Sequence, residues 1–482
     1  MAARYVNLDY DPPLFLPPNL RDWVPAGHVA HFILDVVEEL DLRPVRVNER
    51  GSGSEQYPPR MLLALLLYCY ATGVFSSRRI EQATWDSVPV RLISAGTHPD
   101  HDTICPFRRE NQALLPATFV RVLELAQALE FLPVGQITVA VDGTKVVAHA
   151  SQHSAASCEH AGKTIGPLDQ EVKELMAKAE QADSTPLQEG LNIPGEIVRR
   201  QERKAKLTAA RAQIEARAQA RAAAGMAEYK ARLEPRAKET EPGKKPRGPA
   251  PQAPSAEPKP SDQYNFTDPE SRIMKAGNGQ HFEQCDNAQA AVEVASRLIV
   301  GQRVSQAPND KQELAPTVAT VAAAVESVAT VLTDSGFYSE TAVQTVEQDA
   351  AGQPTGTTVY AAMERKDHHR TVRDLEKQND PPMPATGASL GEVMKHRLPT
   401  AAGKAKYKLR QQTVEPVFGI IKSVMGFRQF LLRGKEKVSL EWQLVCTAYH
   451  RKRLHLMGAG WAMAQAASKP GKWSAGQGEA AP

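Results

Sequence analysis

Cysteine is scarce in this 482-residue chain, which has five cysteines and no C-x-x-C pair. An odd number without paired spacing excludes a disulfide-stapled fold and a zinc-ribbon array. Long apolar runs are missing as well. The longest purely aliphatic run, 61–67, falls far short of the roughly 20 residues that cross a bilayer, so we expect no membrane segment. The N-terminus lacks a basic cap followed by an apolar stretch, which indicates no signal peptide and a cytoplasmic protein.

Aromatic residues are few, at 6%, but 42% of the chain is hydrophobic, which is enough to bury a core. The length suggests about three domains of ~150 residues. The net charge of +3 is unevenly distributed, since residues 196–247 contain fifteen Lys or Arg against seven Glu. Such a segment suits a polyanionic partner, and it equally suits a solvated helical spacer. Prolines between 235 and 260 indicate an extended linker at its end.

The first ordered part of the chain is predicted to be helical from the spacing of its apolar residues and from its capping residues. We expect helices over 29–40, 60–71 and 77–85, and one that opens at Asp102 or Thr103. The last of these carries Arg108, Arg109 and Gln112. Helices joined by a short turn, with exposed arginines, are compatible with helix-turn-helix DNA binding, although most such pairs only pack a bundle.

After residue 130 the pattern changes to short β-branched runs that alternate with helical segments. We expect strands at 136–141, 145–150, 287–294, 298–305, 330–333 and 357–363, and helices at 310–328, 411–425 and 438–456. Two pairs of strands follow each other without a helix between them, so the sheet should be mixed. The strand pattern is lost over 151–262, which indicates an insertion with a long solvated helix at 201–233.

Three acidic residues stand where an active site could use them. Asp142 ends the first strand, Asp334 ends the strand at 330–333, and Glu415 lies near the start of a late helix. If the two strands are neighbours, the aspartates would face one another at the strand ends, where open α/β sheets place their sites. Adjacent carboxylates repel unless cations neutralise them, and oxygen ligands suit Mg²⁺ or Mn²⁺. Taken singly, Asp142-Gly143 is also typical of a hairpin turn, and Asp334 of a helix cap.

The late helix adds residues suited to nucleic acid. Lys422 follows Glu415 by two helical turns, on the same side, and Gly419 between them leaves room for a nucleic-acid backbone. Tyr407 and Arg410 lie just upstream and offer a ring for base stacking and a guanidinium for phosphate. A solvated Glu/Lys face is the alternative interpretation of the same spacing.

Several segments resemble the DDE transposases of bacterial insertion sequences. They are VAVDGTKVVAHAS, NFTDPESRIMKAG, TVLTDSGFYS, YKLRQQTVEPVFGIIK and GFRQFLLRGKEKVSLEWQLVCTAYHRKRL. More narrowly, the last acid and its neighbours resemble the branch with a tyrosine–arginine–glutamate–lysine signature. The stretches LFLPPNLRDWVPAGHVAHFILDVVEELDL, PPRMLLALLLYCYATGVFSSRRIEQ and HDTICPFRR are similar to the helical N-terminal domain of the same transposases.

The resemblance implies an α/β fold, in which an RNase H-like mixed-sheet catalytic core follows an all-helical DNA-binding domain. The expected divisions are 1–130 for the helical domain, 131–150 with 263–456 for the core, 151–262 for a basic helical and proline-rich insertion, and 457–482 for a flexible tail.

The resemblance also implies roles for the residues around the last acid. Asp142, Asp334 and Glu415 are expected to bind two Mg²⁺ or Mn²⁺ ions. Tyr407, Arg410 and Lys422 are expected to contact DNA. One spacing departs from the family, because four residues separate Arg410 from Glu415 where the usual pattern has three.

Two further groups have simpler interpretations. Asp268 precedes Pro269, which favours a helix N-cap over a metal ligand. Histidines and a cysteine cluster within 149–160, but their spacing fits no common zinc pattern.

The expected function is cut-and-paste transposition by hydrolysis and strand transfer at terminal inverted repeats. The expected partners are double-stranded DNA and a second copy of the chain on that DNA, in the nucleoid. Two alternatives stay open, namely an RNase H-like nuclease and a domesticated, non-mobile relic that only binds DNA.

Overall fold

The computed structural model describes residues 19–42, 45, 56–111, 113–182, 192–238, 250–276, 281–325, 327–363, 380–385 and 387–459. The chain divides into two compact units. Met1–Val146 with Asn287–Pro482 forms the first, here called the core unit, and Val147–Asp286 forms the second, the inserted unit. Each is described by itself.

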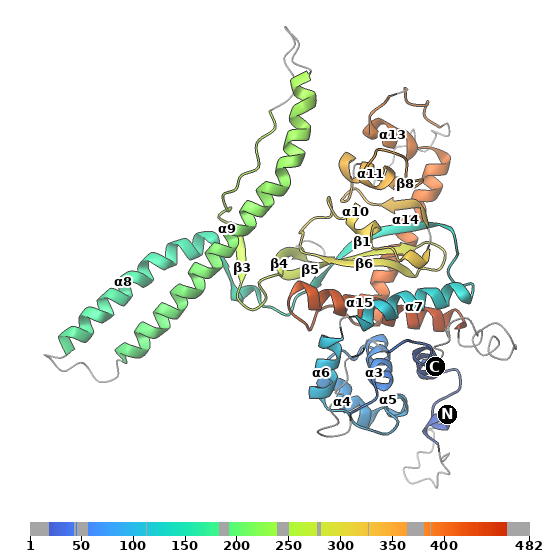
Figure 1. Cartoon of the computed structure of the whole chain (residues 1–482), viewed down its shortest axis with the longest axis horizontal. Helices are drawn as coiled ribbons and strands as arrows, with labels where there is room; N and C mark the ends of the chain where they lie inside the picture. Colours follow the sequence, from blue (N-terminus) through green and yellow to red (C-terminus); the bar gives the residue numbers. More distant parts are fainter. Residues whose placement is uncertain are drawn as a thin grey trace, which may run out of the picture. The chain divides into compact units, whose positions relative to one another are not determined.

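Helices make up the N-terminal part of the core unit (Figure 1). They are α1 Leu20–Trp23, α2 Val29–Glu38, α3 Pro59–Ala71, α4 Ser77–Asp86, α5 Val88–Ile93, α6 His101–Glu110 and α7 Leu114–Ala128. The predicted helices are confirmed, and Ser76 caps α4 by accepting the Arg79 amide. α6 begins slightly earlier than predicted, because its cap is Asp100.

Arg108 is not an exposed arginine. It is buried and donates to the Tyr70 hydroxyl at 2.8 Å and to the Phe75 carbonyl at 2.9 Å. The Tyr70 hydroxyl in turn donates to Glu441 Oε1 at 3.0 Å. Arg108 therefore joins α3 and α6 to α15 (Lys435–Leu456), and of the two predicted arginines only Arg109 is exposed to solvent. Gln112 lies outside the described residues.

Six strands form a mixed sheet. Its strands are β1 Gln136–Val147, β4 Arg272–Ala276, β5 His281–Glu293, β6 Ile299–Ser305, β7 Ser327–Thr333 and β8 Thr358–Ala361. Their order is β4-β5-β1-β7-β8, and β6 also pairs with β5. β1–β7 and β7–β8 are parallel, whereas β5–β6 is antiparallel. The predicted mixed sheet is confirmed. The condition under which the two aspartates would face one another is also met, because β1, which contains Asp142, pairs with β7, which Asp334 directly follows.

Two local predictions are wrong. β1 does not end at Asp142 but runs through Gly143 to Val147, so the predicted break between two short strands is absent. The segment 310–328 is not one helix. It holds only α10 Leu314–Val318 and the 3₁₀ turn Ala323–Val325. The chain leaves the helical path here because the Ala322 amide donates to the Val300 carbonyl at 2.9 Å, which docks the segment on β6.

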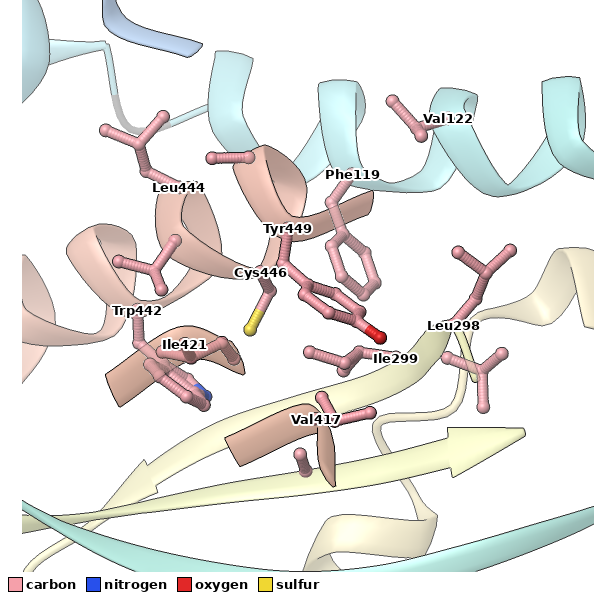
Figure 2. Close-up of a cluster of buried hydrophobic side chains, with 14 of the residues drawn as sticks. Phe119, Val122, Leu298, Ile299, Val417, Ile421, Trp442, Leu444, Cys446 and Tyr449 are labelled. Atoms are coloured by element: carbon pink, nitrogen blue, oxygen red, sulfur yellow. The ribbon is translucent and has the colours of Figure 1, made fainter. Parts of the chain in front are cut away.

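Late helices complete the core unit. They are α11 Glu340–Glu347, α13 Leu390–Arg397, α14 Ala401–Gly419, the π-helical turn Ile420–Val424, and α15. α7 and α15 run along one face of the sheet (Figure 1). In Figure 2, apolar side chains of Phe119, Ile299, Val417 and Tyr449 meet between α7, β6, α14 and α15. This buried cluster holds α14, the helix that contains Glu415, against β6 and α15.

The inserted unit is a helical hairpin with short strands at its base. α8 Cys158–Ala182 pairs with α9 Ile193–Lys238, and β2 Ala155–Ser157 pairs with β3 Gln263–Asn265. The long solvated helix is confirmed. α8 was not predicted, because its apolar contacts with α9 are narrow and involve mainly Ala161, Leu168 and Leu207. The described part of the proline-rich segment, 250–262, forms neither helix nor strand.

Many cations of α9 are paired within the inserted unit. Arg200 contacts Glu171 and Glu196, and Lys204 contacts Asp169. Arg221 pairs with Asp262 at 2.9 Å. These ion pairs favour the interpretation of the basic segment as a solvated helical arm, because they neutralise part of its charge.

Neither Asp268 nor the histidines and cysteine within 149–160 form a metal site among the described residues. Asp268 begins no helix; its carboxylate accepts the Glu270 amide in a turn that leads to β4. The residues that the structure describes contain no group of three or more His, Cys, Asp or Glu side chains arranged for a metal, so the 149–160 cluster is not one. Among the described helices, none combines the length and apolar composition that a membrane span requires.

Replacing Tyr70 by Phe should weaken the core. The change leaves the ring in place but leaves the buried Arg108 and Glu441 without their shared partner, so we expect the free energy of unfolding to fall by about 1–3 kcal/mol. Tyr57→Phe is the matched control, since the Tyr57 hydroxyl makes a single long bond of 3.4 Å to His98. Urea denaturation of both variants checks this, and equal effects would contradict the role of Tyr70.

Candidate active site

The pairing of β1 with β7 brings two aspartates to the same place. Ala140 lies opposite Leu332 in the parallel register. Two residues further along the chain from this pair are Asp142, within β1, and Asp334, just past the end of β7, and the charge of Asp334 acts on Asp142. Asp334 directly follows β7, where its Oδ1 accepts the Gly336 amide at 2.9 Å.

The surroundings of Asp142 disfavour the ionised form of its carboxyl group. Burial raises the pKa of its carboxyl to about 6, Arg410 opposes this rise, and the charge of Asp334 adds to it. The Gly143 amide donates to Asp142 Oδ1 at 2.8 Å. The side chain needs a positive neighbour in order to ionise fully near neutral pH.

Arg410 supplies that positive charge. Its Nη1 lies 3.0 Å from Asp142 Oδ2 and its Nη2 lies 3.5 Å from Glu415 Oε1. Burial lowers the pKa of Arg410, but Asp142 and other neighbouring anions raise it by more, so the net shift is upward. The Arg410 guanidinium therefore links Asp142 on β1 to Glu415 on α14.

α14 carries more of the predicted site than the sequence indicated. It begins at Ala401, so Tyr407 and Arg410 lie on the same helix as Glu415 and not upstream of it. Burial raises the pKa of the Tyr407 hydroxyl, and Arg410 opposes this rise. Arg410 still reaches Glu415 across the unusual four-residue gap because its side chain is long.

Lys422 stands apart from Glu415. The α-helix changes into the π-helical turn between them, so the predicted two regular turns are not kept. Lys422 Nζ donates to the main-chain carbonyl of Lys145 on β1, at 2.7 Å. Lys422 is thereby held at the strand that carries Asp142.

A divalent cation suits this arrangement chemically. As they stand, no three acidic, His or Cys side chains of the described residues form a ready metal cluster. Glu415 is 53% exposed and is drawn to Arg410. Yet Asp142 and Asp334 supply hard oxygen ligands, and a guanidinium already lies among the acids. The donor set fits Mg²⁺ or Mn²⁺, with Arg410 as the positive charge when no metal is bound.

Sequence reasoning missed a second polar cluster next to Asp142. Lys145 Nζ lies 3.6 Å from Asp310 Oδ1. Asp310 Oδ1 also accepts the amide groups of Asn287, at 2.7 Å, and Gln289, at 2.8 Å. Nothing in the spacing marks this cluster, because Asn287 and Gln289 lie within β5 and Asp310 lies in a loop, all far from Asp142 in the chain.

Two family models match the chain. Residues 18–110 match the model described as a transposase domain (DUF772), and residues 384–455 match the model described as a transposase DDE domain. The first covers α1 to α6, and the second covers α13, α14 with Arg410 and Glu415, and α15 up to residue 455. No curated protein matches the chain, and no solved structure matches it.

The two matches, in this order, indicate a transposase. They support the resemblance of the chain to the DDE transposases of insertion sequences. The resemblance seen in the sequence is thus confirmed at the level of the family.

Divalent metal should stabilise the protein in a pH-dependent way. A protonated Asp142 is a poor ligand, and its pKa is raised to about 6. Stabilisation by Mn²⁺ should therefore be small at about pH 5 and grow as the pH rises through 6, to about 3 kcal/mol at ~100 times the dissociation constant. Thermal melts with and without Mn²⁺ check this. Asp142→Asn should abolish the effect, and Asp102→Asn, at an 89% exposed acid, should keep it.

Removing Arg410 should change both the metal-free and the metal-bound protein. In Arg410→Gln, Asp142 and Glu415 lose the cation that contacts both. We expect a lower melting temperature without metal at about pH 8, and a larger rise on adding Mn²⁺, because the metal no longer competes with a guanidinium. Arg109→Gln is the control and should keep the Mn²⁺ shift of the wild type. If Arg410→Gln also showed the wild-type Mn²⁺ shift, the proposed role of Arg410 would be contradicted.

Proposed function

We propose that the chain catalyses cut-and-paste transposition of an insertion sequence. The observation that carries the proposal is the convergence of Asp142 and Asp334 on paired parallel strands, with Arg410 between Asp142 and Glu415. The family supplies the reaction class, and these residues supply the chemistry. We assign Asp142, Asp334 and Glu415 as the acids that hold two Mg²⁺ or Mn²⁺ ions.

An RNase H-like core is the proposed architecture of the catalytic part. The strand order supports it: β5, which pairs with the antiparallel β6, lies beside β1, and the parallel strands β7 and β8 follow on the other side of β1. The first acid then lies on the central strand and the second on its parallel neighbour. α14 brings the third acid from the end of the chain.

The proposed mechanism uses this chain to position DNA and to balance charge. When bound, two divalent ions would activate the attacking oxygen and stabilise the leaving oxygen of the phosphodiester. Arg410, released from Asp142 and Glu415, can move its guanidinium to a phosphate. Water attacks first and breaks a P–O3′ bond, which leaves a 3′-hydroxyl and a 5′-phosphate. That hydroxyl then attacks a second phosphodiester in line and displaces the 3′-oxygen of the attacked strand.

Partners follow from the same proposal. We assign Tyr407, Arg410 and Lys422, the residues of the tyrosine–arginine–glutamate–lysine signature that flank Glu415, to contacts with the terminal inverted repeats. The N-terminal helices are proposed to bind the same double-stranded DNA. Two copies are needed to pair the two ends, so we propose a homodimer on DNA in the bacterial nucleoid. The inserted unit has no assigned role in this scheme.

Cleavage of labelled DNA tests the proposal. The substrate is a duplex that carries the inverted repeat flanking the gene, with Mg²⁺, and a scrambled duplex is the comparison. We expect nicking at the repeat boundary by the wild type. Asp142→Asn, Asp334→Asn and Glu415→Gln should bind the duplex and fail to cut it. Asp349→Asn, at an exposed acid beyond α11, is the matched control and should cut normally.

Other outcomes would overturn the proposal in distinct ways. Cutting that ignores the repeat would indicate a nuclease. Binding without cutting in any divalent metal would indicate a relic. Undiminished cutting by a variant of the three acids would show that the assigned acids are wrong.

A further inference from the structure

Arg428 is an exposed cation just after the π-helical turn that follows α14. Its Nε donates to the main-chain carbonyl of Lys422 at 3.1 Å. Lys422 Nζ in turn donates to the main-chain carbonyl of Lys145, which lies on β1 three residues after Asp142. Arg428 is therefore joined through one residue, Lys422, to the strand that carries the first acid of the candidate site.

The backbone after the π-helical turn holds Arg428 in this position. Gly426 has a φ of 79°, a left-handed conformation that suits glycine, and the Phe427 amide donates to the Ile421 carbonyl at 3.0 Å. The chain thus folds back on the turn, and the Nε bond caps a carbonyl at its end. Within the described residues the two Nη groups of Arg428 have no protein partner. The guanidinium is therefore anchored by one nitrogen and leaves two nitrogens for an anion.

The segment that carries Arg428 packs against the connection between α3 and α4. A Cβ at Gly73 would lie 2.9 Å from the Met425 carbonyl oxygen, so this close approach requires glycine. The rings of Phe75 and Phe427 pack edge to face, with their centroids 5.2 Å apart. α4 begins two residues after Phe75, and Arg428 directly follows Phe427. The first turn of α4 and Arg428 are therefore held at the same junction.

Two more exposed arginines, Arg78 and Arg79, stand in the first turn of α4, which contains no acidic residue. The helix macrodipole disfavours cations at a helix N-terminus, so their placement does not stabilise α4 itself. Within the described ranges neither arginine is paired with a carboxylate. Glu81, the next acid along α4, accepts the His101 amide at 3.1 Å. The positive charge at the start of α4 is therefore left for a partner outside the chain.

We propose that Arg428, Arg78 and Arg79 form one phosphate-binding surface, here called the arginine surface, which holds the DNA duplex beside the bond that is cut. Each strand of a duplex has a phosphate about every 3.4 Å, so a duplex seated at the acids offers further phosphates to cations beyond them. Guanidinium groups without protein partners suit phosphate oxygens. This inference rests on the proposed transposase function and deepens it by naming where the N-terminal helices and the end of the catalytic helix meet the same duplex.

Salt dependence of DNA binding tests the arginine surface. A labelled random-sequence duplex serves as the probe, because phosphate contacts do not depend on base sequence. Each phosphate contact contributes close to one unit to the slope of log affinity against log salt concentration, so Arg428→Gln should lower the slope by about 1. Arg428→Lys keeps the charge and should keep the slope. Arg121→Gln, at an exposed arginine of α7, makes the same charge change outside the surface and should also keep it.

Combined variants test whether the three arginines contact one duplex. Arg78→Gln with Arg79→Gln should lower the slope by about 2, and the triple variant with Arg428→Gln by about 3, because each arginine contacts its own phosphate. Arg78 and Arg79 lie away from the bond that is cut, so their double variant should raise KM for the cleavage substrate and leave kcat unchanged. Melting temperatures equal to that of the wild type show that each variant is folded.

The outcomes separate this inference from the proposed function. A wild type that neither binds nor cuts DNA overturns the proposed function and this inference with it. A wild type that cuts, together with unchanged slopes in the arginine variants, overturns the inference alone. An equal fall of the slope in Arg121→Gln overturns it as well. Unchanged slopes together with a loss of dimer in light scattering would show that the arginine surface binds a second copy of the chain instead of DNA.

Discussion

The parallel pairing of β1 with β7 is the constraint on which the candidate site depends. It places two carboxylates next to each other, and burial already makes the first of them, Asp142, reluctant to ionise. Such an arrangement opposes folding unless positive charge is brought to it. In this structure Arg410 supplies that charge, because it contacts Asp142 and Glu415 together. One guanidinium among three acids leaves negative charge in excess, which is the electrostatic reason why we propose a divalent cation there.

The remaining structure holds this arrangement in place. α14 carries Tyr407, Arg410 and Glu415, and it packs through Val417 into the cluster formed with α15 and β6 (Figure 2). α15 is tied to the N-terminal helices through Glu441 and Tyr70. α15 therefore connects the N-terminal helices to α14 and the sheet through buried contacts. A change in that network can disturb the acids without touching them.

Much of the core unit could be predicted from the sequence. The spacing of apolar residues predicted α2 and α3, a serine cap predicted the start of α4, and runs of β-branched residues predicted the strands. The pairing of β1 with β7 was a hypothesis that followed from two aspartates at strand ends. The three acids were singled out by their positions, but their role as a metal-binding triad came from the resemblance to a family, because a single Asp-Gly is more typical of a turn.

What could not be predicted depends on contacts between distant residues. Local propensity favours a break at Asp142-Gly143, but β1 continues there, with Gln289 and Asp310 packed over the glycine. Arg108 was predicted to be an exposed arginine, but it is buried and donates a hydrogen bond to the Tyr70 hydroxyl. The predicted helix at 310–328 is not formed as one helix, because the Ala322 amide donates a hydrogen bond to the Val300 carbonyl on β6. In each case the partner is too far away in the chain for a pattern to reveal it.

Diffraction from crystals grown with Mn²⁺ tests the central claim most directly, because anomalous scattering locates the ions without reference to activity. The account predicts anomalous peaks between Asp142, Asp334 and Glu415, with the Arg410 guanidinium moved away from Asp142. Peaks elsewhere, or an Arg410 that still bridges Asp142 and Glu415 at saturating Mn²⁺, would contradict it.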